Sequence, residues 1–186
     1  MGIRFQLGED TRTQRSASGF SLIELLIVVA IILIITAIAI PNLLKARMSA
    51  NEASAAENLR TITTAAVVYN STWNNGFPPD MGTFGGPGGS SSTCDFAQLV
   101  DPTLTTAPFQ KSGYQYSYTV SGPPALVAPT CSKPGYFQYV VTAIPLTVGF
   151  TGNRSFCSDQ PGIIHFDTTA AQAATPAACE ALPALQ

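Results

Sequence analysis

One carboxylate, Glu24, lies inside a segment of the sequence that is otherwise almost entirely apolar. The segment reads SGFSLIELLIVVAIILIITAIAIPN, and the only other polar residues within positions 20–40 are Ser21 and Thr36. A carboxylate in lipid is unfavourable by about 2 to 3 kcal/mol even on lenient insertion scales, so it is expected to have a partner. No lysine or arginine lies between Arg15 and Lys45. The partner is therefore not an obvious side chain of the same helix.

A free amino terminus is another cation that Glu24 can reach. If the chain is cut after Gly19, the new amine on Phe20 lies about one helical turn from Glu24. An ammonium and a carboxylate are each unfavourable alone in a low-dielectric medium, so they have reason to pair, within one subunit or between neighbours.

Residues 20–40 are long enough to span a bilayer as a helix. At about 1.5 Å per residue they cover about 30 Å, and a helix satisfies its own backbone groups in lipid. The alternative, a buried helix of a soluble domain, requires more surrounding chain than the sequence has. A secretory signal peptide has a shorter apolar core that ends in its cleavage site, whereas this candidate cut precedes the apolar run. The helix is therefore expected to be retained.

The stretch GFSLIELLIVVAIILIITAIAIPN resembles the cleavage site and N-terminal helix of type IV pilins and the related pseudopilins. In that family a prepilin peptidase cuts between Gly and Phe and methylates the new amine. The resemblance makes residues 1–19 a cleaved leader ending at Gly19, with Phe20 as the N-methylated first mature residue. It makes Glu24 the carboxylate that pairs with a neighbour's amine during assembly. Pro41 also fits the family, and we expect a helix kink there because proline removes a backbone donor.

The pattern after Pro41 predicts an amphipathic helix over residues 42–73, following the transmembrane and assembly helix at 20–41. Its apolar residues fall mostly three and four apart, while charged residues take the other faces. The apolar set is Met48, Leu59, Ile62, Ala66, Tyr69 and Trp73, and the charged set is Lys45, Arg47, Glu52, Glu57 and Arg60. Residues 74–79, NNGFPP, are typical of a helix end.

Residues 74–186 are expected to form a small antiparallel β-sheet head on that apolar stripe, which gives an α+β fold of the pilin type. Strands are predicted at residues 113–122, 136–146 and 162–167, between Gly and Pro turns. Three tyrosines alternate with polar residues in the first of these, which favours a half-buried sheet surface over a binding platform. Residues 82–93, GTFGGPGGSSST, predict a flexible surface loop rather than a phosphate-binding loop.

Four cysteines, Cys94, Cys131, Cys157 and Cys179, all follow the helix and lack the C-x-x-C spacing of a zinc or redox site. In a chain with a membrane-targeting segment they are expected to form two disulfides outside the cytoplasm, with four free thiols as the alternative. They allow three connectivities, and the sequence alone does not choose. Because pilins commonly close a C-terminal loop with a disulfide, the resemblance favours Cys157–Cys179 together with Cys94–Cys131.

The sequence has no pattern typical of an enzyme. His165 is its one histidine, and strand alternation places it on the same face as Asp167, which is a poor geometry for a catalytic triad. The acidic residues are scattered, and a net charge of −2 leaves no basic patch for nucleic acid. We therefore predict no catalytic residue, no metal ligand, no cofactor and no nucleic-acid partner.

The resemblance implies a structural subunit of a type IV pilus. Glu24 favours a body (major-type) subunit, because the minor subunits that cap a filament often lack it. The implied partners are identical or related pilin subunits, the prepilin peptidase, the inner-membrane assembly machinery and, before assembly, the lipid bilayer. The implied location is the inner membrane with the head in the periplasm, and then the extracellular pilus. The alternatives are a pseudopilin of a type II secretion system and, from another class, a membrane-anchored ligand-binding or catalytic domain.

Overall fold

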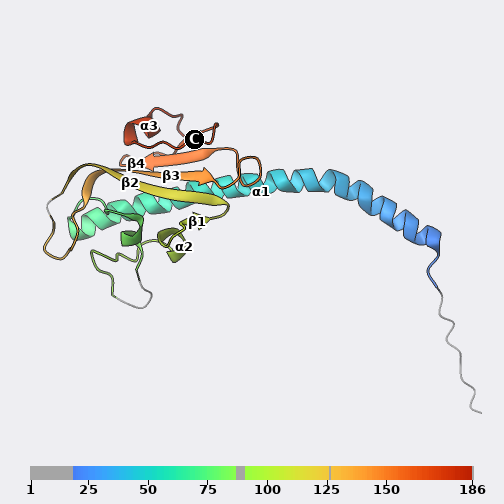
Figure 1. Cartoon of the computed structure of the whole chain (residues 1–186), viewed down its shortest axis with the longest axis horizontal. Coiled ribbons are helices and arrows are strands. Elements are labelled where there is room, and N and C mark those ends of the chain that lie inside the picture. The colour runs from blue at the N-terminus through green and yellow to red at the C-terminus, as the bar shows by residue number, and fades with distance from the viewer. Residues whose placement is uncertain (1–18, 87–90, 126, 186) are drawn as a thin grey trace, which may run out of the picture. The chain divides into compact units, whose positions relative to one another are not determined.

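The computed structural model describes residues 19–86, 91–125 and 127–185, and it contains one long N-terminal helix and a five-stranded antiparallel sheet (Figure 1). This confirms the predicted α+β fold. The chain divides into two compact units, Met1–Pro41 and Asn42–Gln186, which are described separately. Residues 1–18 of the predicted leader lie outside the described residues.

Helix α1 (Leu22–Trp73) runs without a break through Pro41. Its second half contains many alanines, the residue with the highest helix propensity. Asn74 and Gly76 follow the helix with positive φ angles of 50° and 77°, and two prolines then prevent further helical hydrogen bonding. The predicted helix end is thus confirmed, and the kink at Pro41 stays a prediction.

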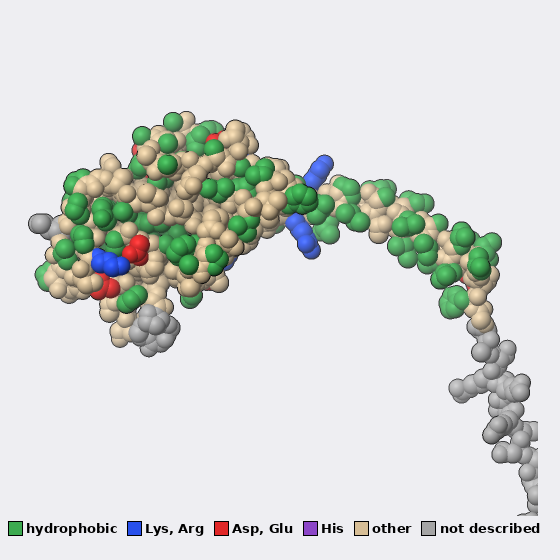
Figure 2. All heavy atoms as spheres, viewed as in Figure 1, with side chains coloured by type: hydrophobic (Ala, Val, Ile, Leu, Met, Phe, Trp, Pro, Cys, Tyr) green, Lys and Arg blue, Asp and Glu red, His purple; other side chains and the backbone are tan. Residues whose placement is uncertain are grey.

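In the first unit, the apolar side chains of α1 are all exposed. By length and composition, α1 is the one helix among the described residues that is able to cross a membrane, and none of its most apolar stretch is buried. Apolar side chains therefore dominate the surface of this part of the helix (Figure 2).

In the second unit, five strands pair in sequence order, each antiparallel to the next. They are β1 (Gln110–Lys111), β2 (Tyr114–Pro124), β3 (Tyr136–Pro145), β4 (Ser155–Asp159) and β5 (His165–Asp167). Two of the predicted strands correspond closely to β2 and β3, and the third is shortened to β5. Sequence analysis missed β1, which has two residues, and β4, whose residues are all buried and so lack alternation.

One face of the sheet packs against the second half of α1. Leu59 and Ile62 of the helix belong to one buried cluster with Tyr114 and Tyr116 of β2 and Val141 of β3. The tyrosine row is therefore a buried sheet surface, as predicted. The apolar stripe of the helix is confirmed at its centre.

Two predictions for this unit are wrong. Glu52 does not lie on a solvent face but is buried, because it accepts hydrogen bonds from the head. The predicted surface loop at residues 82–93 is wrong at its start, which lies in a 3-10 helix, η1 (Met81–Phe84), capped by Asp80, whose side chain accepts from the Thr83 amide. Residues 91–93 are exposed and outside any helix or strand, and residues 87–90 of the predicted loop lie outside the described residues. Phe84 of η1 is fully buried, so burial of an aromatic ring outweighs the glycine-rich composition.

The C-terminal segment covers part of the opposite face of the sheet. Val140 of β3 and Cys157 of β4 pack with Ala173 and with Cys179 of the short helix α3 (Pro176–Glu180). A disulfide joins Cys157 to Cys179, with 5.9 Å between their Cα atoms. The segment is therefore both packed on the sheet and covalently tied to it.

The second disulfide joins Cys94 to Cys131, whose Cα atoms lie 5.1 Å apart. Cys94 packs with Tyr69 near the end of α1. This disulfide therefore ties down the connection between α1 and the sheet. The same connection contains the short helix α2 (Pro102–Thr105). These two pairs are the ones that the resemblance favoured.

Leu59→Ala is expected to lower the free energy of unfolding of the second unit by about 2 to 5 kcal/mol, because it leaves a cavity between α1 and the sheet. Leu59 is 0% exposed, whereas Val67 on the same helix is 52% exposed. Val67→Ala is the matched control, with an expected change below about 0.5 kcal/mol. Urea unfolding of the detergent-solubilised chain measures both, and equal losses would contradict this account of the core.

Candidate assembly site

The candidate assembly site consists of Gly19, Phe20, Glu24 and the apolar surface of α1 that follows. Gly19 and Phe20 precede the helix and are exposed, and an added side chain at Gly19 would meet no atom within 4 Å. The two residues that flank the predicted cut are thus uncovered by any described part of the chain.

Glu24 folds back onto the start of its own helix. Its Oε2 accepts a hydrogen bond from the Ser21 amide at 3.0 Å, one of the amides that have no partner inside a helix. Ser21 precedes the first helical residue, and Glu24 stands three positions later, so the pair has the spacing of a capping box. The negative charge also lies at the positive end of the helix dipole.

Sequence analysis missed this capping contact, although its signal was present. The letters S-x-x-E before an apolar run are the usual signature, and SLIE at residues 21–24 supplies them. The Ser21 amide is one residue from the Phe20 nitrogen. The contact therefore holds the carboxylate close to the atom that becomes the amine in the predicted cut.

The exposed part of α1 requires a covering that the first unit does not provide. Exposed leucine and isoleucine side chains run along it, and each is unfavourable in water by about 1.5 to 3 kcal/mol relative to burial. Both lipid and the apolar helices of other chains provide such an apolar covering.

Within the second unit, Glu52 fixes α1 to the end of the sheet. Its Oε1 accepts from the amides of Asn153 at 2.8 Å and Arg154 at 3.3 Å, and its Oε2 accepts from Arg154 Nε at 2.8 Å. The Arg154 guanidinium also lies 5.7 Å from the ring centre of Phe156 and 5.4 Å from that of Phe166. A buried carboxylate with this many donors sets the register between helix and head.

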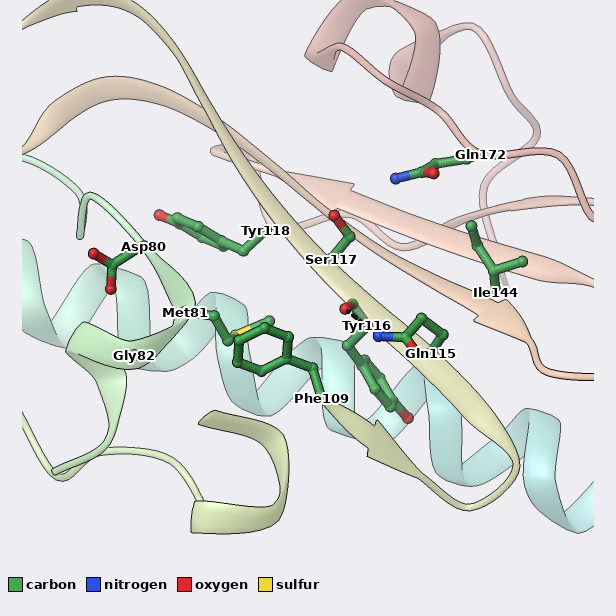
Figure 3. Close-up of a pocket in the computed structure, with 10 residues that line it drawn as sticks. All are labelled: Asp80, Met81, Gly82, Phe109, Gln115, Tyr116, Ser117, Tyr118, Ile144 and Gln172. Carbon is green, nitrogen blue, oxygen red and sulfur yellow. Dashed lines mark hydrogen bonds between the residues drawn. The ribbon is translucent and has the colours of Figure 1, made fainter. Parts of the chain in front are cut away.

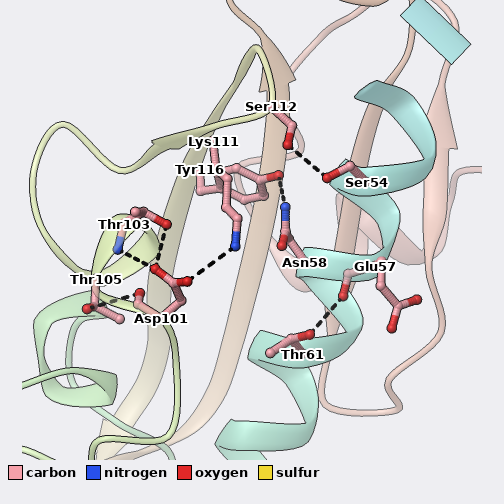
Figure 4. Close-up of polar contacts among 10 residues, drawn as sticks. All are labelled: Ser54, Glu57, Asn58, Thr61, Asp101, Thr103, Thr105, Lys111, Ser112 and Tyr116. Atoms are coloured by element: carbon pink, nitrogen blue, oxygen red, sulfur yellow. Dashed lines mark hydrogen bonds and ion pairs between the residues drawn. The ribbon is translucent and has the colours of Figure 1, made fainter. Parts of the chain in front are cut away.

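Two further polar contacts join α1 to the sheet (Figure 4). The Ser54 hydroxyl donates to the Ser112 hydroxyl at 2.9 Å, and Asn58 Nδ2 donates to the Tyr116 hydroxyl at 2.9 Å. Burial raises the pKa of Tyr116 to about 12, against the opposing effect of the Asn58 hydrogen bond. The phenol therefore remains neutral in the core at physiological pH.

A pocket of about 650 Å³ opens beside β2, with Asp80, Met81, Phe109 and Tyr118 among its walls (Figure 3). Burial raises the pKa of Tyr118 well above its usual value. For Asp80, burial raises the pKa, but hydrogen bonds from Lys133 and Thr83 outweigh it and hold the pKa below its usual value. Neither group exchanges a proton readily near neutral pH, so these two groups do not form a general acid–base pair.

His165, the one histidine, has a structural position. It is buried, and its Nδ1 lies 2.7 Å from the Leu182 carbonyl oxygen. Asp167 instead accepts from the amide and hydroxyl of Thr169. The two side chains therefore have separate partners, and among the described residues no three His, Cys, Asp or Glu side chains form a potential metal site.

Residues 14–40 match the family described as Prokaryotic N-terminal methylation motif. The chain carries a type IV prepilin motif. A similar protein is the Type IV wide pilus major component PilA4 of Thermus thermophilus, which is 66% identical over 38 residues, or 20% of this chain and 29% of that protein. The predicted resemblance is confirmed over this segment.

The head of the chain lies outside these matches. The match with the Thermus thermophilus protein spans less than a third of that protein's length, and no solved structure matches the chain. The prepilin motif therefore contains Gly19, Phe20 and Glu24, while the arrangement of the head comes from the structure alone.

A buried carboxylate, Asp159, ends β4 beneath the C-terminal segment. It is 0% exposed, and both of its oxygens lack a hydrogen-bond partner among the described residues. Burial raises its pKa, the negative charge of Glu180 raises it further, and His165 partly opposes them. The charged form of Asp159 is therefore less favourable in the folded chain than in an exposed aspartate.

Asp159→Asn is expected to stabilise the head, by on the order of 1 kcal/mol, because it removes a buried charge that lacks a partner. Because the pKa of Asp159 is raised, the contribution of this residue to stability is most favourable below the ordinary aspartate pKa of about 3.9 and is lost as pH rises through the folded value. The advantage of the variant should therefore grow with pH over that range. Asp167→Asn, which keeps one oxygen to accept from the amide and hydroxyl of Thr169, is the control.

Urea unfolding of both variants across pH 4 to 8 tests this account of Asp159. An advantage of Asp159→Asn that stays constant or shrinks as pH rises would contradict it.

Proposed function

We propose that this chain is a structural subunit of a type IV pilus, and not an enzyme. In this proposal the prepilin peptidase cuts between Gly19 and Phe20 and methylates the new amine. The mature subunit then waits in the inner membrane with its head in the periplasm, and the assembly machinery adds it to a filament of identical or related subunits. The observation that carries the proposal is the prepilin motif at residues 14–40.

The exposed surface of α1 supports the storage and assembly steps. A helix with this many exposed apolar side chains is stable in lipid and equally in a bundle of similar helices. When the helix moves from lipid into a bundle of helices, one apolar surrounding replaces another. The large apolar surface therefore does not oppose extraction into the bundle.

Glu24 supports an ordered bundle. Its contact with the Ser21 amide holds the carboxylate at the helix end where a processed chain has its amine. In the proposed filament this carboxylate pairs with the amine of a neighbouring subunit, and a misplaced subunit leaves both charges unpaired in a low-dielectric core. The pair then selects the correct axial register.

The relative favours a body subunit of a pilus over a pseudopilin. The Thermus thermophilus protein is named a major component of a wide pilus, and its similarity to this chain includes the segment that assembles in our proposal. The two disulfides of the head support a periplasmic and then extracellular location, because such bonds persist in oxidising compartments.

The mature chain is expected to begin at Phe20 and to carry one added methyl group on its amine. Mass analysis of the N-terminal peptide from sheared filaments tests this processing step. An N-terminus at Met1 in assembled material, or a cut after Ala39, would contradict the proposed mechanism.

Two variants of Glu24 separate its capping contact from its charge. Glu24→Ala removes both, whereas Glu24→Gln keeps an oxygen that is able to cap the helix. Because an unpaired amine in the bundle is strongly unfavourable, both variants are expected to lower filament yield by about tenfold or more. Membrane levels should stay normal, since neither variant adds a charge to lipid.

Immunoblots of the sheared filament fraction and of the membrane fraction measure the two quantities. Normal filaments from Glu24→Gln, with few from Glu24→Ala, would mean that Glu24 acts as a helix cap only. Normal filaments from both variants would remove Glu24 from assembly altogether.

A further inference from the structure

Three apolar side chains project into solvent from the connection between β3 and β4. Leu146, Val148 and Phe150 are 46%, 59% and 70% exposed. They alternate along the sequence LTVGFTG of residues 146–152, which contains no charged residue. We call these three residues the β3–β4 apolar tip.

The apolar tip is held in one conformation. The Thr147 carbonyl accepts from the amides of Phe150 at 3.1 Å and Thr151 at 2.9 Å, and the Gly149 amide donates to the Gly152 carbonyl at 3.0 Å. Gly149 has a φ of 85°, which suits glycine. The exposure of the three side chains is thus a property of an ordered turn.

The turn lies at the end of the second unit where α1 enters it (Figure 1). Asn51 Nδ2 donates to the Thr151 carbonyl at 3.0 Å, and Glu52 binds the following amides. Leu43 and Leu44 follow the apolar run and are the last apolar residues before Lys45, and Leu44 lies seven residues before Asn51, or about 10 Å along the helix. That distance is comparable to the thickness of a lipid headgroup layer, about 5 to 8 Å.

The charges on this part of α1 suit an anionic surface. Lys45 and Arg47 follow the apolar run, and no ion pair within the described part of the chain involves either of them. Figure 2 shows basic side chains projecting from the helix next to this end of the second unit. Glu52, the nearest acidic residue, is neutralised by Arg154.

We infer that the β3–β4 apolar tip inserts into the headgroup layer of the bilayer that α1 crosses, while Lys45 and Arg47 contact anionic lipid phosphates. The partner is therefore a phospholipid surface. Three side chains offer far less than the roughly 800 Å² per partner of a stable protein interface, whereas interfacial insertion of aromatic and aliphatic groups beside basic ones needs no such area. The inference rests on the membrane stage of the proposed function.

Tryptophan fluorescence in vesicles tests the contact, because Trp73 is the one tryptophan of the chain. The full chain with Trp73→Phe and Phe150→Trp is placed in phosphatidylcholine–phosphatidylglycerol vesicles that carry a nitroxide at headgroup depth. Phe137→Trp in the same background is the matched control. Phe137 is 58% exposed and lies near the other end of β3, nine residues from Leu146, or about 30 Å away.

The tryptophan at position 150 is expected to lose about half or more of its emission to the headgroup quencher, and the one at position 137 to lose little. Replacing phosphatidylglycerol with phosphatidylcholine should weaken the quenching at position 150. Equal quenching at the two positions, or none at position 150, would overturn the inference. A second experiment uses filaments in which neighbouring subunits, and not the lipid, carry the nitroxide. Quenching at position 150 in these filaments, with none in vesicles, would also overturn the inference and assign the tip to a second copy of the chain.

Leu33→Trp in the same background separates this inference from the proposed function. Deep quenching at position 33 by lipids brominated on their acyl chains establishes that α1 spans the vesicle bilayer. With that result, an unquenched tryptophan at position 150 overturns the inference alone. Without it, the membrane stage of the proposed function fails, and the inference fails with it.

Discussion

The second half of α1 has to be buried by its own chain, whereas the first half is exposed and, in the proposed function, has to remain so for another partner. A single helix meets both demands because its composition changes near Pro41. Before that point large aliphatic side chains surround the helix, and after it alanines alternate with a few large residues on one face. Small residues let the sheet approach closely, so that Leu59 and Ile62 fit among the tyrosines of β2 and β3. The head is therefore arranged around one half of a helix.

Polar and charged contacts of the head lie at particular positions along the packed half of α1. Arg154 pairs with Glu52 at the end of the sheet where the chain leaves the apolar part of α1. At the other end of α1, Asn75 is fully buried. It donates to the Lys133 carbonyl at 3.0 Å and accepts from the Ala128 amide at 3.0 Å. Polar contacts thus fix both ends of the packed second half of α1, and apolar packing holds the part between them.

The sequence was sufficient to predict the elements with strong periodicity. The helix end, the strands β2 and β3 and the buried tyrosine row follow from patterns in residues close together in the chain. The remaining features depend on tertiary contacts. Glu52 is indistinguishable from a solvent-facing acid until Arg154 is brought beside it from 102 positions away, and β4 loses its alternation because the C-terminal segment covers its second face. In the candidate assembly site, Glu24 was proposed from its charge in an apolar segment and from the family resemblance, and its capping contact needed only the spacing to Ser21.

The two disulfides also determine how the chain responds to tension. They enclose separations of 37 and 22 residues, and a fully extended chain measures about 3.4 Å per residue. A head pulled open from its ends therefore keeps about 200 Å of its contour length locked behind covalent bonds. In the proposed filament, such a subunit yields over a shorter distance under load, because the segments that the bridges enclose, with β1 and β2 in one and β5 in the other, are not drawn out. Mechanical extensibility is thus limited by covalent topology as well as by the strength of the core.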